Sequence, residues 1–348
     1  MTRSENNRWL TGFAAFVAVN TLLLIALGGL VTSKGAGMAV PDWPTTYGYN
    51  MFLFPPSFWQ GGILYEHTHR LFASWVGLIT VVLAVWMWWE EPRKWLRRLS
   101  YLAVGLVIFQ GVLGGLRVRL ILDQIGIFHA GLAQAFLVLL CAIALYRSRW
   151  WRQMPGAGLT AKAVTWLGGF TGLIFVQLLL GATMRHEHAG LAVPDFPLAY
   201  GRLWPATDPE TLSALNLTRG FLPVTSYQIH LHMLHRLGAL AILVFSVLLT
   251  RRLLRAAGAG SPLSKGVAIW QCLIVTQAIL GACTVWTGKA DDIATLHVVL
   301  GAICLAWTAL LTLVAVRLSR PIDSGMRSTP RLETPRKTSN SAAMASLS

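Results

Sequence analysis

The chain has 348 residues, of which 55% are hydrophobic and only 12% are charged. This balance is too apolar for a soluble domain of that size and indicates an integral membrane protein with several spans. The net charge of +15 could favour nucleic acid, but Lys and Arg form short clusters between apolar runs, which indicates membrane topology instead.

Apolar runs along the chain predict eight membrane-spanning helices, because each run approaches the roughly 20 residues that a helix needs to cross the hydrocarbon. The first run has no convincing cleavage site after it, so we expect a retained helix rather than a signal peptide. The fold class is therefore all-α and polytopic. The predicted spans are residues 10–32, 68–89, 99–120, 126–146, 163–184, 230–250, 267–287 and 293–316.

Basic residues mark one side of the predicted spans. Both tails and the connections at 90–98, 147–162 and 251–265 carry most of the 29 Lys and Arg residues. Cytoplasmic loops are enriched in these residues, so both termini are predicted to be cytoplasmic. The last residues, 317–348, are rich in Ser, Thr, Pro and Arg, which predicts a disordered cytoplasmic tail.

The sequence contains an internal repeat. GMAVPDWPTTYG at 37–48 returns as GLAVPDFPLAYG at 190–201, and FQGVLGG at 109–115 returns as TQAILGA at 276–282. Each repeat holds four spans, an even number, so we expect two parallel-oriented four-helix bundles related by a pseudo-two-fold axis along the membrane normal. The predicted divisions are an N-terminal tail (1–9), a first half (10–146), a linker (147–162), a second half (163–316) and the C-terminal tail (317–348).

Four histidines lie at the predicted outer starts of the even-numbered spans: His69, His129, His235 and His297. Imidazole inside a membrane is costly and usually marks a functional site, although a hydrogen bond to a neighbouring helix is the simpler alternative for any one of them. Two opposed imidazoles in each half favour haem iron over a closed zinc or copper site, which would need three or four ligands.

Charged residues accompany these histidines. Arg70 and Arg236 directly follow their histidines and could bind haem propionates or extend to the membrane interface. Glu66 lies one helical turn before His69, where a buried carboxylate could accept a proton; the alternative is an exposed acid capping the helix. Its repeat counterpart is His232, which suggests that the first half carries the chemistry and the second holds a haem cofactor.

The remaining histidines and the cysteines are expected to have other roles. We expect Asp42 and Asp195 to brace the repeated outer turns. The cysteines lie in or beside apolar runs, which predicts neither a loop disulfide nor a thiolate metal site. Histidines expected to be solvated or to support the site are His67, His186, His188, His230 and His232; the cysteines are Cys141, Cys272, Cys283 and Cys304.

Six segments occur in a characteristic order: GGLVTSKGAGMAVPDWP, EHTHR, FHAGLAQ, AVPDFP, HMLHR and LHVVLG. Together they resemble the haem A synthase family (CtaA/Cox15-type) over all eight predicted spans. The resemblance implies a membrane oxidoreductase that converts the C8 methyl group of haem O, through hydroxylated intermediates, to the formyl group of haem A for terminal oxidase assembly. It also implies a location in the bacterial plasma (inner) membrane.

The resemblance implies separate roles for the two halves. His235 and His297 would bind haem b (iron) as a cofactor, whereas His69 and His129 would receive the substrate haem O. Glu66 matches the catalytic glutamate of the family. The implied partners are the haem O synthase, terminal oxidase assembly factors and the lipid membrane, a homo-oligomer is compatible with the sequence, and nucleic acid is not expected.

The sequence departs from many bacterial members of the family in the repeated turns. Those members carry a Cys pair there, but this chain has Val40 and Thr46, and in the second half Val193 and Ala199, so a disulfide-dependent step cannot apply. The sequence leaves two alternative functions to compare. A di-haem membrane cytochrome b would only transfer electrons, for example from quinol, and a metal or haem transporter is disfavoured by the even number of spans in each repeat.

Overall fold

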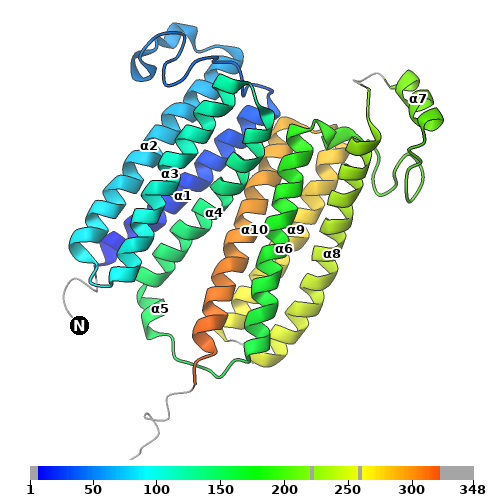
Figure 1. Cartoon of the computed structure of the whole chain (residues 1–348). Coiled ribbons are helices and arrows are strands. Elements are labelled where there is room, and N and C mark those ends of the chain that lie inside the picture. The colour runs from blue at the N-terminus through cyan, green and yellow to red at the C-terminus, as the bar shows by residue number, and fades with distance from the viewer. Residues whose placement is uncertain (1–6, 220–222, 258–260, 322–348) are drawn as a thin grey trace, which may run out of the picture.

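The computed structural model describes residues 7–219, 223–257 and 261–321, which form a helical fold (Figure 1). Extended pairing among them is limited to two isolated bridges in the outer loops. Two shorter helices, α5 (Arg149–Gln153) and α7 (Pro209–Thr218), lie in connections. The long helices are α1 (Arg8–Ser33), α2 (Gly61–Glu90), α3 (Lys94–Leu120), α4 (Asp123–Arg147), α6 (Ala161–His186), α8 (Ser226–Ala257), α9 (Pro262–Trp286) and α10 (Asp291–Leu318).

The eight long helices have the length and composition needed to cross a membrane. Large apolar side chains remain about half exposed on them, including Leu23 (51%), Phe109 (52%) and Phe245 (52%). Such surface is unfavourable in water and is accommodated by hydrocarbon. The chain is therefore a multi-pass membrane protein, and the predictions of an all-α fold and of eight spans are confirmed.

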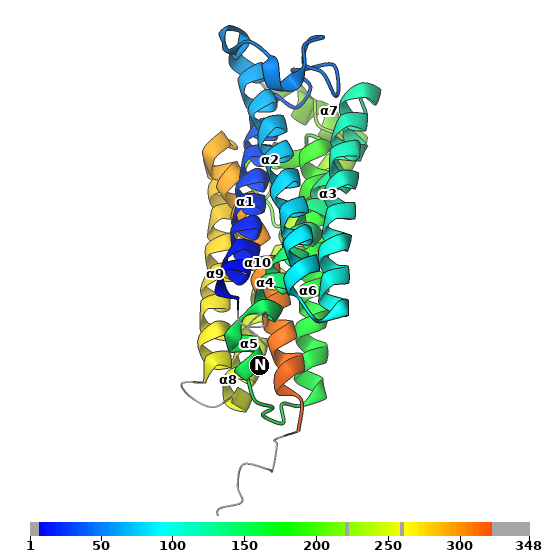
Figure 2. The same ribbon diagram turned by 90° about the vertical axis from the view of Figure 1, so that its left-hand side faces the viewer.

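The long helices contact one another in two closed sets. In the first, α1 and α3 each contact both α2 and α4; in the second, α6 and α9 each contact both α8 and α10. The sets meet where α1 packs on α10, and where α4 packs on α6 and α10. Helix α1 starts and α10 ends at one end of the molecule, which we call the inner end (Figures 1 and 2).

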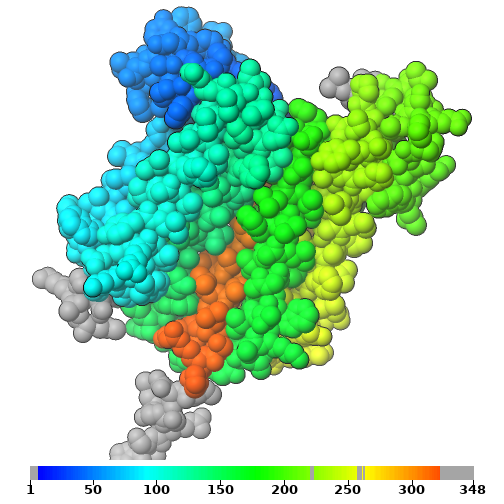
Figure 3. All heavy atoms as spheres, viewed as in Figure 1, coloured from blue at the N-terminus to red at the C-terminus, as the bar shows by residue number. Residues whose placement is uncertain are grey.

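The opposite, outer end carries the long connections α1–α2 and α6–α8. The space-filling view shows them projecting beyond the helices on opposite flanks of the molecule (Figure 3). The first contains the 3-10 helices η2 (Met51–Leu53) and η3 (Pro56–Phe58). The second contains η4 (Ala189–Leu191) and also α7, which makes it the longer of the two connections.

The even-numbered predicted spans begin earlier than their hydropathy indicated. Helix α2 begins at Gly61 and α8 at Ser226, not at residues 68 and 230. The four candidate histidines therefore lie roughly two turns inside their helices, about 9–14 Å along the axis from the outer ends at 1.5 Å per residue. The expectation that each histidine begins its helix was wrong, because the residues before it are also helical; in α2 the outer loop buries two of them, Glu66 and His67.

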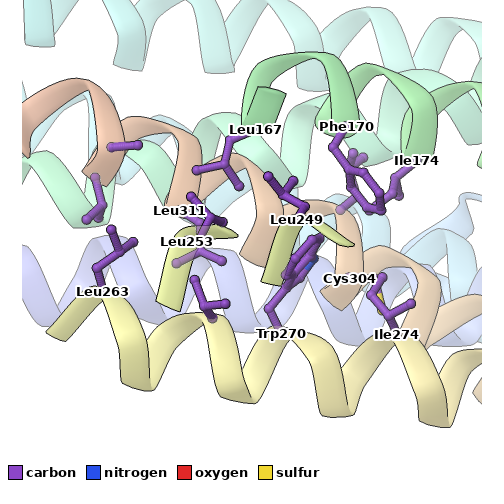
Figure 4. Packing of buried hydrophobic residues seen from close by; sticks show 14 of the residues in the cluster. Leu167, Phe170, Ile174, Leu249, Leu253, Leu263, Trp270, Ile274, Cys304 and Leu311 are labelled. Carbon is purple, nitrogen blue, oxygen red and sulfur yellow. The ribbon is translucent and has the colours of Figure 1, made fainter. Parts of the chain in front are cut away.

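An apolar core fills the inner part of the second set (Figure 4). Trp270 is fully buried there, lies edge-on to Phe170 at a ring distance of 5.0 Å and donates a hydrogen bond to Thr308 Oγ1 at 2.9 Å. Leu167, Leu253 and other aliphatic side chains surround it. In a membrane such close packing and interhelical hydrogen bonds hold helices together, since lipid supplies little hydrophobic driving force between them.

Ion pairs stabilise the inner end of the first set. Glu91, directly after α2, pairs with Arg93 at 2.6 Å and with Arg147 at the end of α4. Arg147 is fully buried and also donates to the backbone carbonyl of Asn7 at 3.3 Å. Burial alone would raise the pKa of Glu91, but hydrogen bonds from both arginines hold that pKa below its usual 4.5. This cluster links three segments at the inner end.

The predicted division at 147–162 falls on the connection that contains α5, and helix α10 continues to Leu318. The disorder predicted for the C-terminal tail concerns residues that lie, from 322 onward, outside the described part of the chain; residues 1–6 of the N-terminal tail also lie outside it.

Candidate functional site

The repeated outer turns have the same internal structure. Asp42 and Asp195 each accept hydrogen bonds from the backbone N–H groups five and six residues later, at 2.7 and 2.9 Å. The first of these donors has a positive φ in each turn, 49° at Tyr47 and 54° at Tyr200, and each is followed by a glycine. The prediction that the two aspartates brace the turns is confirmed.

Arginines from the helices fix these turns in place. Arg70 of α2 donates to the carbonyl oxygens of Val40 (2.8 Å), Asp42 (2.6 Å) and Thr45 (3.2 Å). Arg236 of α8 makes the same three contacts at the repeat-equivalent carbonyls, those of residues 193, 195 and 198. A propionate role for either arginine would therefore require exchange of these hydrogen bonds.

The two halves differ at the position one turn before the first histidine. Glu66 is 4% exposed, accepts a hydrogen bond from the backbone N–H of Val40 at 2.8 Å and pairs with Arg70 at 2.7 Å. His232 is 3% exposed and its Nδ1 accepts from the backbone N–H of Val193 at 3.3 Å. The alternative of an exposed helix-capping acid is excluded, because Glu66 is buried inside α2.

The four candidate histidines come together in two pairs. His69 of α2 lies close enough to His129 of α4 for their charges to interact, and His235 of α8 lies equally within range of His297 of α10. The Nδ1 atoms of His69, His129 and His297 are buried and have no hydrogen-bond partner in the described residues. Both imidazoles of the first half and one of the second, that of His297, therefore have a buried nitrogen that the described residues leave unsatisfied.

A glycine from the neighbouring helix packs against each imidazole. A methyl group added at Gly28 of α1 would lie 3.0 Å from Cε1 of His69, and one at Gly114 of α3 would lie 3.5 Å from that of His129. The corresponding distances are 3.2 Å from Gly181 to His235 and 3.1 Å from Gly281 to His297. The glycines occupy repeat-equivalent positions, so the ring environment is repeated with the histidines.

Glutamines distinguish the two pairs. Gln177 and Gln277 donate to the backbone carbonyls of His235 (2.8 Å) and His297 (3.0 Å), and their amide nitrogens also lie 3.1 and 3.4 Å from a ring nitrogen of the same histidine. In the first half Gln110 contacts only the backbone of His129, at 3.0 Å. The second pair is therefore held by side-chain amides, whereas in the described residues the rings of the first pair are not.

The remaining histidines differ in environment. His188 and His230 are exposed, as expected for solvated residues. His67 is fully buried: its Nδ1 lies 3.2 Å from Thr46 Oγ1, and its ring packs on Trp59 at 4.8 Å. The side chain of His186 is only 8% exposed. The four cysteines are free thiols.

A sequence profile for the COX15-CtaA family, described as cytochrome oxidase assembly protein, matches residues 7–310. The chain belongs to this family. One similar protein, from Caulobacter sp. (strain K31), is 28% identical over 358 residues, which cover 92% of this chain and 98% of its own length. Another, from Shouchella clausii (strain KSM-K16), is 27% identical over 291 residues, which cover 82% of this chain and 89% of its own length. Both are named heme A synthase.

The donor set of this COX15-CtaA member fits haem better than a bare metal ion. No cluster of three or more His, Cys, Asp or Glu side chains suited to a metal ion occurs among the described residues. A haem needs only two protein ligands, because the porphyrin supplies the other four. Two imidazoles per half, each packed against a glycine of the neighbouring helix, meet that requirement.

Sequence reasoning missed Gly28 and the glutamines. The signal was present, because Gln110 and Gln277 occupy the same place in FQGVLGG and TQAILGA, and Gly28 and Gly181 are separated by the same offset as the repeated turns. Small residues are common at helix contacts, so hydropathy and motif patterns did not distinguish these from ordinary packing.

Proposed function

We propose that this protein is a haem A synthase: it oxidises the C8 methyl group of haem O to the formyl group of haem A, which terminal oxidases require. The family membership and the names of the similar proteins support this function. With water as the source of the oxygen atom, the conversion of methyl plus water to formyl passes four electrons to an electron acceptor and releases four protons, two from the substituent and two from the water. The site must therefore hold the porphyrin and provide for both electron and proton transfer.

The proposed architecture consists of two four-helix halves with the same orientation, α1–α4 and α6–α10, related by a pseudo-two-fold axis along the membrane normal. The helix contacts support it, since α1 packs on α10 in the way that α6 packs on α4. We place the inner end, with its Arg-rich connections, in the cytoplasm of a bacterial cell and the histidine pairs toward the outer face of the plasma membrane.

In the second half, His235 and His297 hold haem b. This cofactor supplies one-electron redox chemistry when bound. Gln177 and Gln277 restrict both imidazoles, which suits a permanently bound group because ordered ligands lose little freedom on binding. His232 replaces the carboxylate of the first half, so this half has no acid one turn before its first ligand.

In the first half, His69 and His129 receive haem O as substrate. Their rings have no side-chain hydrogen bond in the described residues, which suits a group that must enter and leave. Glu66 is the acceptor for protons released as the methyl group is oxidised, and Arg70 orients its carboxylate through the 2.7 Å ion pair. The observation that carries this assignment is Glu66 buried one turn before His69, where the other half has His232.

Co-expression of the full chain with a source of haem O tests the function. We expect haem A or its hydroxylated precursor in extracts analysed by mass spectrometry, and a bis-histidine haem b spectrum in the purified protein. Purified protein that holds haem B at both sites and leaves haem O unchanged would reject the synthase and favour the di-haem cytochrome.

A further inference from the structure

Two partly buried arginines lie at the outer end, each within electrostatic range of one histidine pair. Arg117 is in the last turn of α3 and Arg185 in the last turn of α6, so each half contributes one. They are close enough for their charges to interact. Their repeat-equivalent positions hold Thr284 and Thr32, so this pair occurs once in the molecule and does not follow the two-fold relation.

Arg117 belongs to the first site. It lies within electrostatic range of both His69 and His129, and its guanidinium packs against the backbone at Gly37. One terminal nitrogen pairs with Asp123 at 3.1 Å, while its buried Nε has no hydrogen-bond partner in the described residues. Asp123 is 47% exposed, so it neutralises this cation incompletely.

Arg185 connects the second site to the first half. It lies within electrostatic range of His297, yet it donates to the carbonyl of Gly29 and, at 2.7 Å, to Ser33 Oγ, both on α1. Its Nε is also buried without a partner in the described residues. The nearby Asp291 pairs with Lys34 at 2.8 Å and also lies within electrostatic range of Arg185, so this one carboxylate is shared between two cations.

His186 directly follows Arg185 and contacts the first half near Asp123, the ion-pair partner of Arg117. Its ring packs against Gly126 of α4, and its Nδ1 lies 3.9 Å from Asp123 Oδ1. Lys289 adds a further cation within range of Arg185. Cations are therefore in excess around this junction. The cations are Arg117, Arg185, Lys289 and Lys34, and the carboxylates that face them are Asp123 and Asp291.

We propose that Arg117 and Arg185 form a carboxylate-binding junction that takes the propionate groups of the porphyrins held by both histidine pairs. This inference rests on the proposed function. Guanidinium groups bind carboxylates through paired, charge-assisted hydrogen bonds, and a buried excess of cations favours an anionic ligand. Arg70 and Arg236 are less suited, because their terminal nitrogens already bind turn carbonyls.

Iron protoporphyrin IX and its dimethyl ester, which lacks free carboxylates, provide the test. Each would be titrated into full-length protein prepared without haem and followed by the bis-histidine absorbance. Arg185→Gln is measured in a His69→Ala background, so that only the second site binds, and Arg117→Gln in a His297→Ala background. Arg119→Gln is the matched control, because Arg119 is exposed in the same turn of α3 as Arg117.

We expect each background protein to bind the free acid about 10- to 100-fold more tightly than the diester, as charge-assisted hydrogen bonds predict. Arg117→Gln and Arg185→Gln should reduce this preference to a few-fold while diester affinity stays the same, and Arg119→Gln should leave it intact. An unchanged preference in both variants would overturn the junction alone. Absence of any bis-histidine spectrum in the wild-type protein would overturn both the junction and the proposed function.

Discussion

The outer turns of the two halves share one design but face a different buried side chain one helical turn before the first histidine. In both, an aspartate braces the turn, an arginine binds three turn carbonyls and the backbone N–H of a valine points at the helix. That N–H meets the carboxylate of Glu66 in the first half and the imidazole of His232 in the second. The same frame thus presents a different acid–base group beside each histidine pair.

The inner ends differ more broadly. The first half carries the buried Glu91–Arg147 pair, whereas the repeat-equivalent position of Arg147 is Ala315, also fully buried, in an apolar core. A charge in one half is therefore replaced by hydrocarbon in the other. The two differences have different consequences. The outer difference affects the chemistry at a bound porphyrin, whereas the inner difference affects the stability of the fold.

The comparison at the outer end is tested most strongly by Glu66→Gln. Glutamine preserves the size and can still accept from Val40, but it cannot take a proton, so haem A formation should fall about 10²- to 10⁴-fold, the usual contribution of a general base. His232→Gln is the matched change in the other half and should lower the rate far less. Haem A would be quantified by mass spectrometry under co-expression.

The haem b spectrum should persist in both variants, since neither residue is a proposed ligand. If Glu66→Gln retained the wild-type rate, Glu66 would be a brace for the turn and the chemical distinction between the halves would be lost.

The sequence predicted the eight spans, the turn-bracing aspartates and the asymmetry at Glu66, because long apolar runs and an internal repeat are visible without coordinates. It did not predict where the helices begin. Hydropathy treats Glu66 and His67 as surface residues, whereas the α1–α2 connection folds back and buries both. That burial depends on contacts distant in sequence.

The junction at Arg117, Arg185 and His186 was missed for a different reason. Comparison of the repeats directs attention to residues that recur, and these three have Thr284, Thr32 and Ser33 as counterparts. An interface used once between two similar halves is necessarily asymmetric. Only the packing of α6 against α4 shows that His186 faces the first half.

The inner-end comparison is tested by Glu91→Ala. This change leaves the fully buried Arg147 without its carboxylate, and loss of one partner of a buried pair costs about 3–5 kcal/mol. We expect a marked fall in thermal stability in detergent, followed by the fluorescence of the buried tryptophans. Ala315→Ser, at the equivalent place of Arg147 in the second half, should cost far less.

The pH dependence provides a second measurement of the same pair. The pKa of Glu91 is lowered in the folded protein, so its contribution is present above its unfolded pKa and is lost as the pH falls through the lower folded value. Wild-type protein should therefore lose stability under acid relative to Glu91→Ala. Parallel stability curves for the two proteins from neutral pH to below pH 4 would contradict this account.

The glycines beside the imidazoles leave little space for a larger side chain at three of the four positions. Gly28→Ala, Gly181→Ala and Gly281→Ala each place a methyl group 3.0–3.2 Å from a histidine ring, and overpacking of this kind costs about 1–3 kcal/mol. Gly114→Ala places it at 3.5 Å, an ordinary contact, and serves as the control. We expect weaker porphyrin binding, by absorbance titration, in the first three variants. Equal affinity in all four would show that the rings move freely.

The smallest expected difference lies in the turns themselves. Burial alone would raise the pKa of Asp42, but hydrogen bonds from Gly48, Thr45 and Tyr47 hold that pKa below 3.8. The pKa of Asp195 is likewise lowered by hydrogen bonds from backbone N–H groups. Asp195 has no hydrogen bond equivalent to that from the Thr45 hydroxyl, because Leu198 occupies the place of Thr45. Both turns should therefore be braced above the unfolded pKa of about 3.9 and loosen as the pH falls through the lower folded values.

Asp42→Asn should then loosen its turn by about 1 kcal/mol more than Asp195→Asn, the usual net value of one hydrogen bond. Hydrogen exchange at the amides of Tyr47 and Tyr200, which donate to these carboxylates, would report each turn separately. Thr45→Val should remove the excess and make the two turns alike. If Thr45→Val left the exchange of Tyr47 unchanged, the hydroxyl would contribute nothing, and the braced turns would be equivalent in energy as well as in geometry.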